Sequence, residues 1–344
     1  MARPVISYPG AKWRFYQHIK PYIPRDTKVW IEPFFGGGSM SLSVADDPSF
    51  SKIERMIGGD LAPEIWALWV GIRDNPDDVM EISKRWFDES CPHHKEIQKI
   101  NRDIMLKYVE KEDIDIDADD TIDNNTKQYI REARELYNLA IEEGRKFWDW
   151  TQNVDCESLS IPERAARTYL VNRISFSGMG DSGSLSKQRF SGFNYGMLSR
   201  ISEASPLLKR MELYNVSFEE TMKYGNDDPE HSFIFLDPPY YKQEESGLYG
   251  KDGDTHRGFP HEHFAEFTKS MKCKWFVTYD DSVKVRRMFR GKTALGNRCT
   301  MVPFTIPGGY TMAVKASEDA LAGEELFIAN YNIKDMNNLD LADL

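Results

Sequence analysis

The sequence predicts an α/β fold, in which both ends of the chain build one Rossmann-like, mostly parallel sheet around a helical and loop-rich insertion. Short apolar strands alternate with helical segments near the start of the chain and again in its second half, as in parallel sheets with crossover helices. Between these parts, residues 76–151 show helical periodicity and high charge. We therefore expect a sheet domain over residues 1–74 and 212–334, an insertion over residues 75–211 and a flexible tail over residues 335–344.

The first part of the chain alternates between helical and extended segments. Residues 29–32 form a short apolar strand directly before a glycine turn, and residues 54–59 form a second strand that ends at Asp60. Strand, glycine turn and helix in this order are typical of a ligand-binding βαβ unit. Helices are expected over residues 12–23, 40–45 and 62–73.

The middle of the chain lacks this alternation, and the second half restores it. Residues 113–123 are acidic and predict a solvated loop between two long helices. Residues 172–196 are rich in Gly, Ser, Phe and Arg and predict a loop or hairpin. Beyond them we expect strands over residues 212–216, 232–236, 274–278 and 325–331, helices over 261–272 and 282–289, and an antiparallel hairpin over 301–314.

The negative charge of the chain belongs to one segment. The net charge is −11, and residues 74–163 alone hold 24 acidic and 12 basic residues, or −12, so the remainder is close to +1. A basic surface for nucleic acid therefore remains possible outside that segment. No apolar run approaches a membrane span and no cysteine pair has metal-ligand spacing. We expect a cytoplasmic protein, a monomer or weak dimer, with neither membrane nor metal.

A glycine turn and an acidic residue predict a nucleoside cofactor. Gly36, Gly37 and Gly38 follow the first strand, where a ligand can approach backbone N–H groups at a helix N-terminus. Asp60 ends the second strand, where a carboxylate can accept both hydroxyls of a ribose. A ligand-free tight turn and a helix-capping Asp are the alternative interpretations.

The tetrapeptide Asp237-Pro238-Pro239-Tyr240 carries the strongest chemical indication. It follows an apolar strand, and its two prolines stiffen the chain and remove backbone donors. The Asp237 carboxylate and the Pro238 carbonyl can then accept both N–H bonds of an amino group on a planar heterocycle, with the Tyr240 ring beside it. The alternative, a proline turn that only ends a strand, does not account for the other two motifs.

Together these motifs resemble the Dam-like, D12-class (alpha-group) DNA adenine-N6 methyltransferases, especially those of phages. The resemblance rests on the loop from Tyr8 to Lys12, on Glu32-Pro33-Phe34-Phe35-Gly36-Gly37-Gly38, on Asp60 and on the tetrapeptide at Asp237. Asn172-Arg173, Phe176 and the segment 192–196 also look like that family, whereas residues 76–160 remain unassigned. The N-terminal loop departs from the Trp-Ala-Gly-Gly-Lys of many members, and the Gly/Ser stretch 178–192 is longer than usual.

The resemblance implies a class I methyltransferase sheet that binds S-adenosylmethionine. It also implies a restriction–modification context and double-stranded DNA as the partner. Residues 75–211 would recognise the target sequence. Tyr240 would stack on a flipped-out adenine. Catalysis is assigned to Asp237, Pro238, Pro239 and Tyr240. Cofactor binding is assigned to Tyr8, Pro9, Gly10, Ala11, Lys12, Glu32, Pro33, Phe34, Gly36, Gly38, Asp60, Leu61, Phe218 and Asp237, and DNA binding to Arg173, Lys187, Arg189, Asn194 and Arg200.

Other functions are compatible with parts of this pattern. A non-catalytic nucleic-acid binder could keep the fold, but it has no need of the intact tetrapeptide. Methylation of cytosine N4, RNA adenine or glutamine would use the same grip on an amino group, and by the resemblance the leading Asp237 favours adenine. A nicotinamide enzyme is disfavoured because the glycine turn is not G-x-G-x-x-G.

Overall fold

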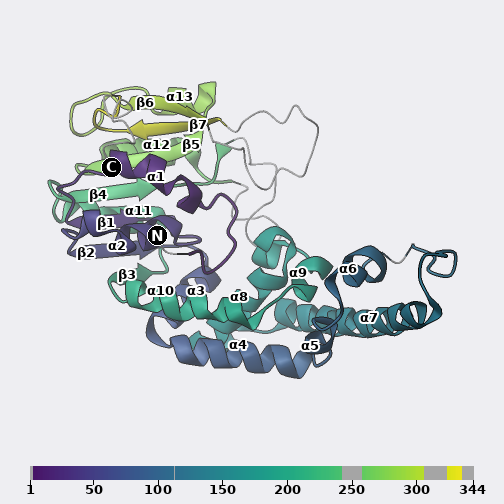
Figure 1. Cartoon of the computed structure of the whole chain (residues 1–344). Coiled ribbons are helices and arrows are strands. Elements are labelled where there is room, and N and C mark those ends of the chain that lie inside the picture. Colours follow the sequence, from purple (N-terminus) through teal and green to yellow (C-terminus); the bar gives the residue numbers. More distant parts are fainter. Residues whose placement is uncertain (1–2, 112, 242–257, 306–323, 335–344) are drawn as a thin grey trace.

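A computed structural model describes residues 3–111, 113–241, 258–305 and 324–334. It contains one seven-stranded sheet in the order β3-β2-β1-β4-β5-β7-β6 (Figure 1). The first five are mutually parallel, and β7 runs antiparallel to both β5 and β6. The predicted fold class is therefore confirmed, including the antiparallel final pair. The strands are β1 (Val29–Glu32), β2 (Arg55–Gly59), β3 (Met211–Tyr214), β4 (Ser232–Leu236), β5 (Lys274–Asp280), β6 (Thr300–Thr305) and β7 (Glu324–Ala329).

Both faces of the sheet are buried, and side chains alternate between them. Phe233 and Phe235 of β4 join one apolar cluster, whereas Ile234 and Leu236 join the other. This alternation follows from the two-residue period of a strand, and both sets are apolar because helices cover both faces. The first cluster includes side chains from α1 (Tyr16–Ile19), α2 (Ser39–Asp46), α3 (Pro63–Asp74) and α10 (Ser199–Leu208); the second includes side chains from α11 (Phe218–Lys223), α12 (His261–Ser270) and α13 (Val283–Met288).

The strand order places a switch point between β1 and β4. From β1 the chain proceeds to β2 and β3 on one side, and from β4 to β5 on the other. In open α/β sheets, ligands bind outside the carboxyl ends of the strands at such a point. Glu32 and Asp237 lie at the ends of these two neighbouring strands, so the sequence motifs meet where the fold favours a site.

The insertion is helical and extends away from the sheet (Figure 1). The 30-residue α7 is its longest element, and residues 113–123, expected as an acidic loop, precede it. In the described part of the chain no helix is both long and apolar enough to cross a membrane. The insertion contains α4 (Pro76–Ser90), α5 (His94–Ile97), α6 (Arg102–Ile104), a π-helix (Met105–Val109), α7 (Asn124–Asn153), α8 (Ile161–Ile174) and α9 (Lys187–Ser191).

Two predicted elements end at other residues than expected, or can be followed only in part. Helix α8 continues to Ile174, so Asn172 and Arg173 are helical and buried, although the sequence placed them in a loop. The hairpin expected over residues 301–314 is described only as far as Thr305; β6 pairs with β7, and residues 306–323 lie outside the described part. The predicted tail from residue 335 also lies outside it.

Candidate active site at the carboxyl ends of β1 and β4

Asp237 follows β4 and is held on two sides. The Thr278 hydroxyl, from the neighbouring β5, donates to its Oδ1 at 2.7 Å. The Lys12 ammonium donates to its Oδ2 at 2.9 Å and lies 2.9 Å from Oδ1 as well. The carboxylate is still 21% exposed, in contrast to the 2% of Lys12. It is therefore fixed in direction and remains accessible from the carboxyl edge of the sheet.

Lys12 is a buried cation, 2% exposed, although the sequence alone is equally compatible with a solvated surface lysine. Its ammonium also donates to the Gly10 carbonyl at 2.8 Å and lies 3.7 Å from Glu325 Oε1. Burial alone would lower the pKa of Lys12, but the Asp237 and Glu325 carboxylates outweigh burial and raise it above its usual value. Lys12 therefore remains protonated in the site.

Tyr240 is almost buried, and its ring and hydroxyl are both engaged. The ring stacks on Tyr279 with centroids 5.9 Å apart, and the Lys12 ammonium lies over it at 5.0 Å from the centroid. The hydroxyl donates to Glu325 Oε1 at 2.9 Å. Glu325 and Thr278 were not among the predicted site residues. The one local indication for Glu325 was a carboxylate beside the apolar run Leu326–Ala329.

The glycine turn has a backbone that other residues would adopt only with strain. Gly36 and Gly38 have φ of +45° and +63°, in the left-handed region. A Cβ on Gly36 would lie 2.7 Å from Cε1 of Tyr8, so the ring of the N-terminal loop packs directly on the turn. Trp69 fixes the turn from behind by donating to the Gly36 carbonyl at 2.7 Å. The two sequence-distant loops thus form one surface.

Asp60 and Glu32 are carboxylates whose oxygens accept from backbone N–H groups. Asp60 accepts from Gly36 N at 2.7 Å and from Ala62 N at 2.8 Å, next to an exposed Leu61. Burial raises the pKa of Asp60 to about 6. Glu32 accepts from Ser41 N at 2.9 Å, and burial raises its pKa to about 8. Glu32 is therefore largely protonated at neutral pH in this state.

The remaining predicted cofactor residues divide into a loop and an aromatic cluster. Phe218, at the start of α11, stacks on Phe34 with ring centroids 5.6 Å apart, and both pack against Phe264. Phe218 is 8% exposed, so it contributes to the core as well as to the border of the site. Pro9 is buried, and Ala11 is half-buried next to Lys12.

The predicted DNA contacts fall into two groups. Three arginines hold the N-terminal segment: Arg189 donates to Ser7 Oγ at 3.0 Å, Arg200 donates to the Pro4 carbonyl at 3.1 Å, and buried Arg173 donates to the Val5 carbonyl. Asn172 joins them, donating to the Ser7 carbonyl at 2.6 Å. Lys187 and Asn194 are instead exposed.

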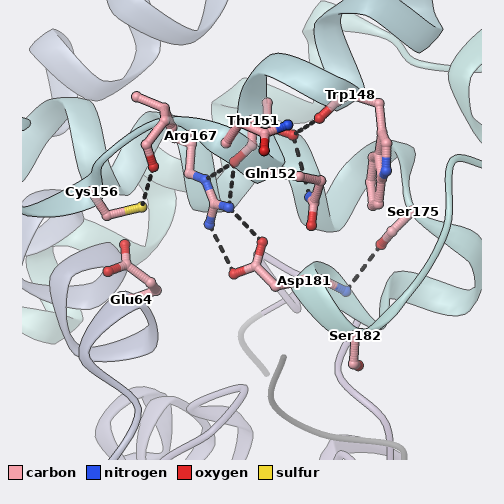
Figure 2. A network of polar contacts seen from close by, with 12 residues as sticks. Glu64, Trp148, Thr151, Gln152, Cys156, Arg167, Ser175, Asp181 and Ser182 are labelled. Carbon is pink, nitrogen blue, oxygen red and sulfur yellow. Dashed lines mark hydrogen bonds and ion pairs between the residues drawn. The ribbon is translucent and has the colours of Figure 1, made fainter. Parts of the chain in front are cut away.

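An ion pair between buried Arg167 and partly exposed Asp181 anchors the Gly/Ser stretch 178–192 to the helices of the insertion (Figure 2). Arg167 of α8, 4% exposed, bonds Asp181 Oδ2 at 2.8 Å. Its Nε and Nη2 donate to the Thr151 carbonyl at 2.9 and 2.5 Å. That carbonyl belongs to the last turn of α7, which lacks intrahelical donors. Arg167 therefore joins α7, α8 and the segment that contains Asp181.

Comparison with known proteins identifies the family of the chain. A family model described as D12 class N6 adenine-specific DNA methyltransferase matches residues 8–111 and 118–298, including most of the segment 76–160 that the motifs left unassigned. A type II methyltransferase of Lactococcus lactis subsp. cremoris is 22% identical over 270 residues, covering 76% of this chain and 72% of that protein. A DNA adenine methylase of Haemophilus influenzae is 31% identical over 85 residues, covering 25% of this chain and 27% of that protein.

Proposed function

The chain belongs to the D12 class of N6 adenine-specific DNA methyltransferases, and from this premise we propose which of its residues carry the reaction. Enzymes of this class transfer a methyl group to adenine N6 in DNA, with S-adenosylmethionine as the general donor. We assign the chemistry to Asp237, Pro238, Pro239 and Tyr240. The observation that supports this most is the accessible Asp237 carboxylate, held by Thr278 and Lys12 at the switch point of the sheet.

The residues around the switch point suit a cationic nucleoside. Among the described residues of the site, Glu32, Asp60, Asp237 and Glu325 provide four carboxyl groups, and Lys12 provides one ammonium. S-adenosylmethionine supplies an electrophilic methyl group on a positively charged sulfur. A bound cation would favour the ionised form of Glu32, whose pKa burial raises to about 8. We propose that Asp60 and the glycine turn bind the nucleoside, with the loop from Tyr8 to Lys12 and Phe34, Leu61 and Phe218 around it.

Asp237 and Pro238 would make the adenine amino group a better nucleophile. Its nitrogen lone pair is delocalised into the ring, so the free amino group is weakly nucleophilic. Hydrogen bonds from its two N–H groups to the Asp237 carboxylate and the Pro238 carbonyl would localise that lone pair. The carboxylate also stabilises positive charge that grows on N6. Orienting the nitrogen in line with the methyl group contributes further.

The target base has to leave the duplex to reach this site, because an adenine that is paired and stacked cannot bring its amino group to Asp237. Tyr240 is the proposed stacking surface. Its orientation is fixed by Tyr279 and Glu325, so the ring is already positioned before a base arrives. Such preorganisation lowers the cost of forming the reactive geometry.

We propose that residues 1–74 and 212–334 form the catalytic unit and that residues 75–211 recognise DNA. Within residues 75–211, some side chains would contact DNA directly and others would hold the N-terminal segment. Exposed Lys187 and Asn194 are the proposed direct contacts. Arg173, Arg189 and Arg200 act on the N-terminal segment that leads to Lys12, as their bonds to residues 4–7 indicate. The name of the Lactococcus relative, a type II methyltransferase, supports a restriction–modification context.

The assignment is tested with Asp237→Ala. Because the variant lacks the acceptor for the amino group, transfer of labelled methyl groups to DNA should fall by at least about 10²-fold. The affinity for S-adenosylmethionine, measured by calorimetry, should change only a few-fold. Asp227→Ala, at a 65% exposed position paired with Arg55, is the matched control and should keep normal turnover. Normal turnover in Asp237→Ala would refute the proposed catalytic centre.

A further inference from the structure

Lys12 engages the same groups that the substrate base needs. It contacts both oxygens of Asp237 at 2.9 Å and lies over the Tyr240 ring at 5.0 Å from its centroid. In the proposed function, Asp237 accepts hydrogen bonds from the amino group, and Tyr240 stacks on the base. A carboxylate has about four lone-pair positions, and Thr278 together with the two Lys12 contacts uses three of them. Because the ammonium faces both oxygens, Lys12 and the amino group compete for Asp237.

Moving a buried ammonium away from its carboxylate is costly unless another acceptor is within reach. Lys12 is 2% exposed, and an unpaired charge at such a position carries a large desolvation penalty. Glu325 offers the second acceptor. Its Oε1 lies 3.7 Å from the ammonium, compared with 2.9 Å for Asp237, so a displacement of under about one ångström exchanges the partners.

Glu325 is itself rigidly placed. It is 1% exposed on β7, where the antiparallel register sets it opposite Asp280 of β5. Its Oε1 accepts the Tyr240 hydroxyl at 2.9 Å. One carboxylate thus contacts both the stacking ring and the competing cation. It also lies outside residues 8–298, the span that the family model matches.

We propose that Glu325 is a positioning residue that holds Tyr240 and receives the Lys12 ammonium when Asp237 turns to the substrate amino group. This inference rests on the proposed function, because it requires Asp237 to be the acceptor for that group. The ammonium never leaves a carboxylate during the exchange, so the site avoids an uncompensated buried charge. Asp237 regains its acceptor capacity only as the base arrives.

The test separates the charge of Glu325 from its shape. Glu325→Gln keeps the size and can still accept the Tyr240 hydroxyl, whereas Glu325→Asp keeps the charge and shortens the side chain. If the charge receives Lys12, kcat should fall by about tenfold or more in the Gln variant, and less in the Asp variant. KM for DNA should change little in both, because the effect arises after binding. Glu325→Asp falling below Glu325→Gln would overturn the proposal.

A second comparison separates Lys12 from Tyr240. In a Tyr240→Phe background the hydroxyl is gone, so any further loss of kcat caused by Glu325→Gln must act through Lys12. Loss of the Glu325→Gln effect in that background would overturn the exchange. Should the Gln variant not fold, Glu325→Asp and Glu325→Asn give the same contrast, because they differ only in charge.

Two controls make the outcomes distinguishable. Glu212→Gln neutralises a carboxylate of β3 that pairs with Arg55 at 2.6 Å. Because β2 and β1 separate β3 from β4, this variant should keep wild-type kcat. Asp237→Ala run in parallel reports on the proposed function itself. An inactive Asp237→Ala with a fully active Glu325→Gln overturns only the role of Glu325. An active Asp237→Ala overturns the catalytic assignment on which that role rests.

Discussion

At the scale of single residues, the burial of Glu32 makes the free energy of unfolding depend on pH. It is 3% exposed at the end of β1, and burial raises its pKa to about 8 from an ordinary 4.5. The folded state therefore holds a proton that the unfolded state has lost between these two values. The stabilising effect of Glu32 is complete below about pH 4.5 and is lost as pH rises towards 8.

Glu32→Gln should remove most of this dependence. Gln mimics the protonated carboxyl and can still accept from Ser41, so the ligand-free variant should lose less stability than wild type between pH 5 and 8. The difference should be roughly 3–4 kcal/mol in the free energy of unfolding, measured by urea titration at each pH. Glu132→Gln, on the exposed side of α7, is the control. An unchanged loss of stability in Glu32→Gln would contradict the proposed protonation.

The site residues that the sequence predicted can be found from their immediate neighbours, whereas those it missed depend on the order of the strands. Lys12, Asp60 and Asp237 each lie beside a local pattern, a glycine or the end of an apolar strand, that can be seen within a few residues. Thr278 and Glu325 act at the site only because β5 and β7 are placed beside β4 in the sheet. Strand order of this kind is a property of the whole fold, so the apolar run beside Glu325 could not show which site that carboxylate joins.

At the scale of elements, Arg167 fixes the relation between α7, α8 and the Gly/Ser segment. Asp181→Asn should leave the guanidinium without its carboxylate while the bonds to Thr151 remain. Because Asp181 is 27% exposed, we expect a loss of roughly 1–3 kcal/mol in the free energy of unfolding, less than for a fully buried pair. KM for DNA should rise several-fold, since the segment lies in the proposed recognition region.

The matched control for this pair is on the surface of α7. Glu142 lies 3.5 Å from Arg145, and both side chains are more than half exposed. Such pairs contribute little to stability, so Glu142→Gln should change neither thermal unfolding nor KM. Equal effects of the two substitutions would show that Arg167 and Asp181 do not act as an anchor.

The sequence predicted the end of α8 wrongly. A capping box of Ser160 and Glu163 begins this helix, and Gly178 is the first glycine after it. Local composition therefore favoured a loop from residue 172 onwards. The helix continues because Asn172 and Arg173 find acceptors in the N-terminal segment, at Ser7 and Val5. Those acceptors are about 165 residues away in sequence, so only the tertiary structure provides them.

At the scale of the whole molecule, an acidic part of the chain can be distinguished from a basic part. The acidic residues are concentrated over residues 74–163, which include the projecting α7, while residues 164–212 hold 8 basic and 3 acidic residues (Figure 1). DNA binding releases counterions in proportion to the phosphates that the protein neutralises. Only cations on the DNA-facing side should therefore influence the salt dependence of binding.

Two exposed lysines test this division directly. Lys187 is at the start of α9 in the basic segment, and Lys146 is 75% exposed on α7 in the acidic one. Lys187→Ala should reduce the slope of log affinity against log salt concentration by about one unit, since one phosphate contact is lost. Lys146→Ala should leave the slope unchanged. Fluorescence anisotropy with a duplex at several salt concentrations measures both, and a larger effect at Lys146 would place the DNA along the acidic insertion instead.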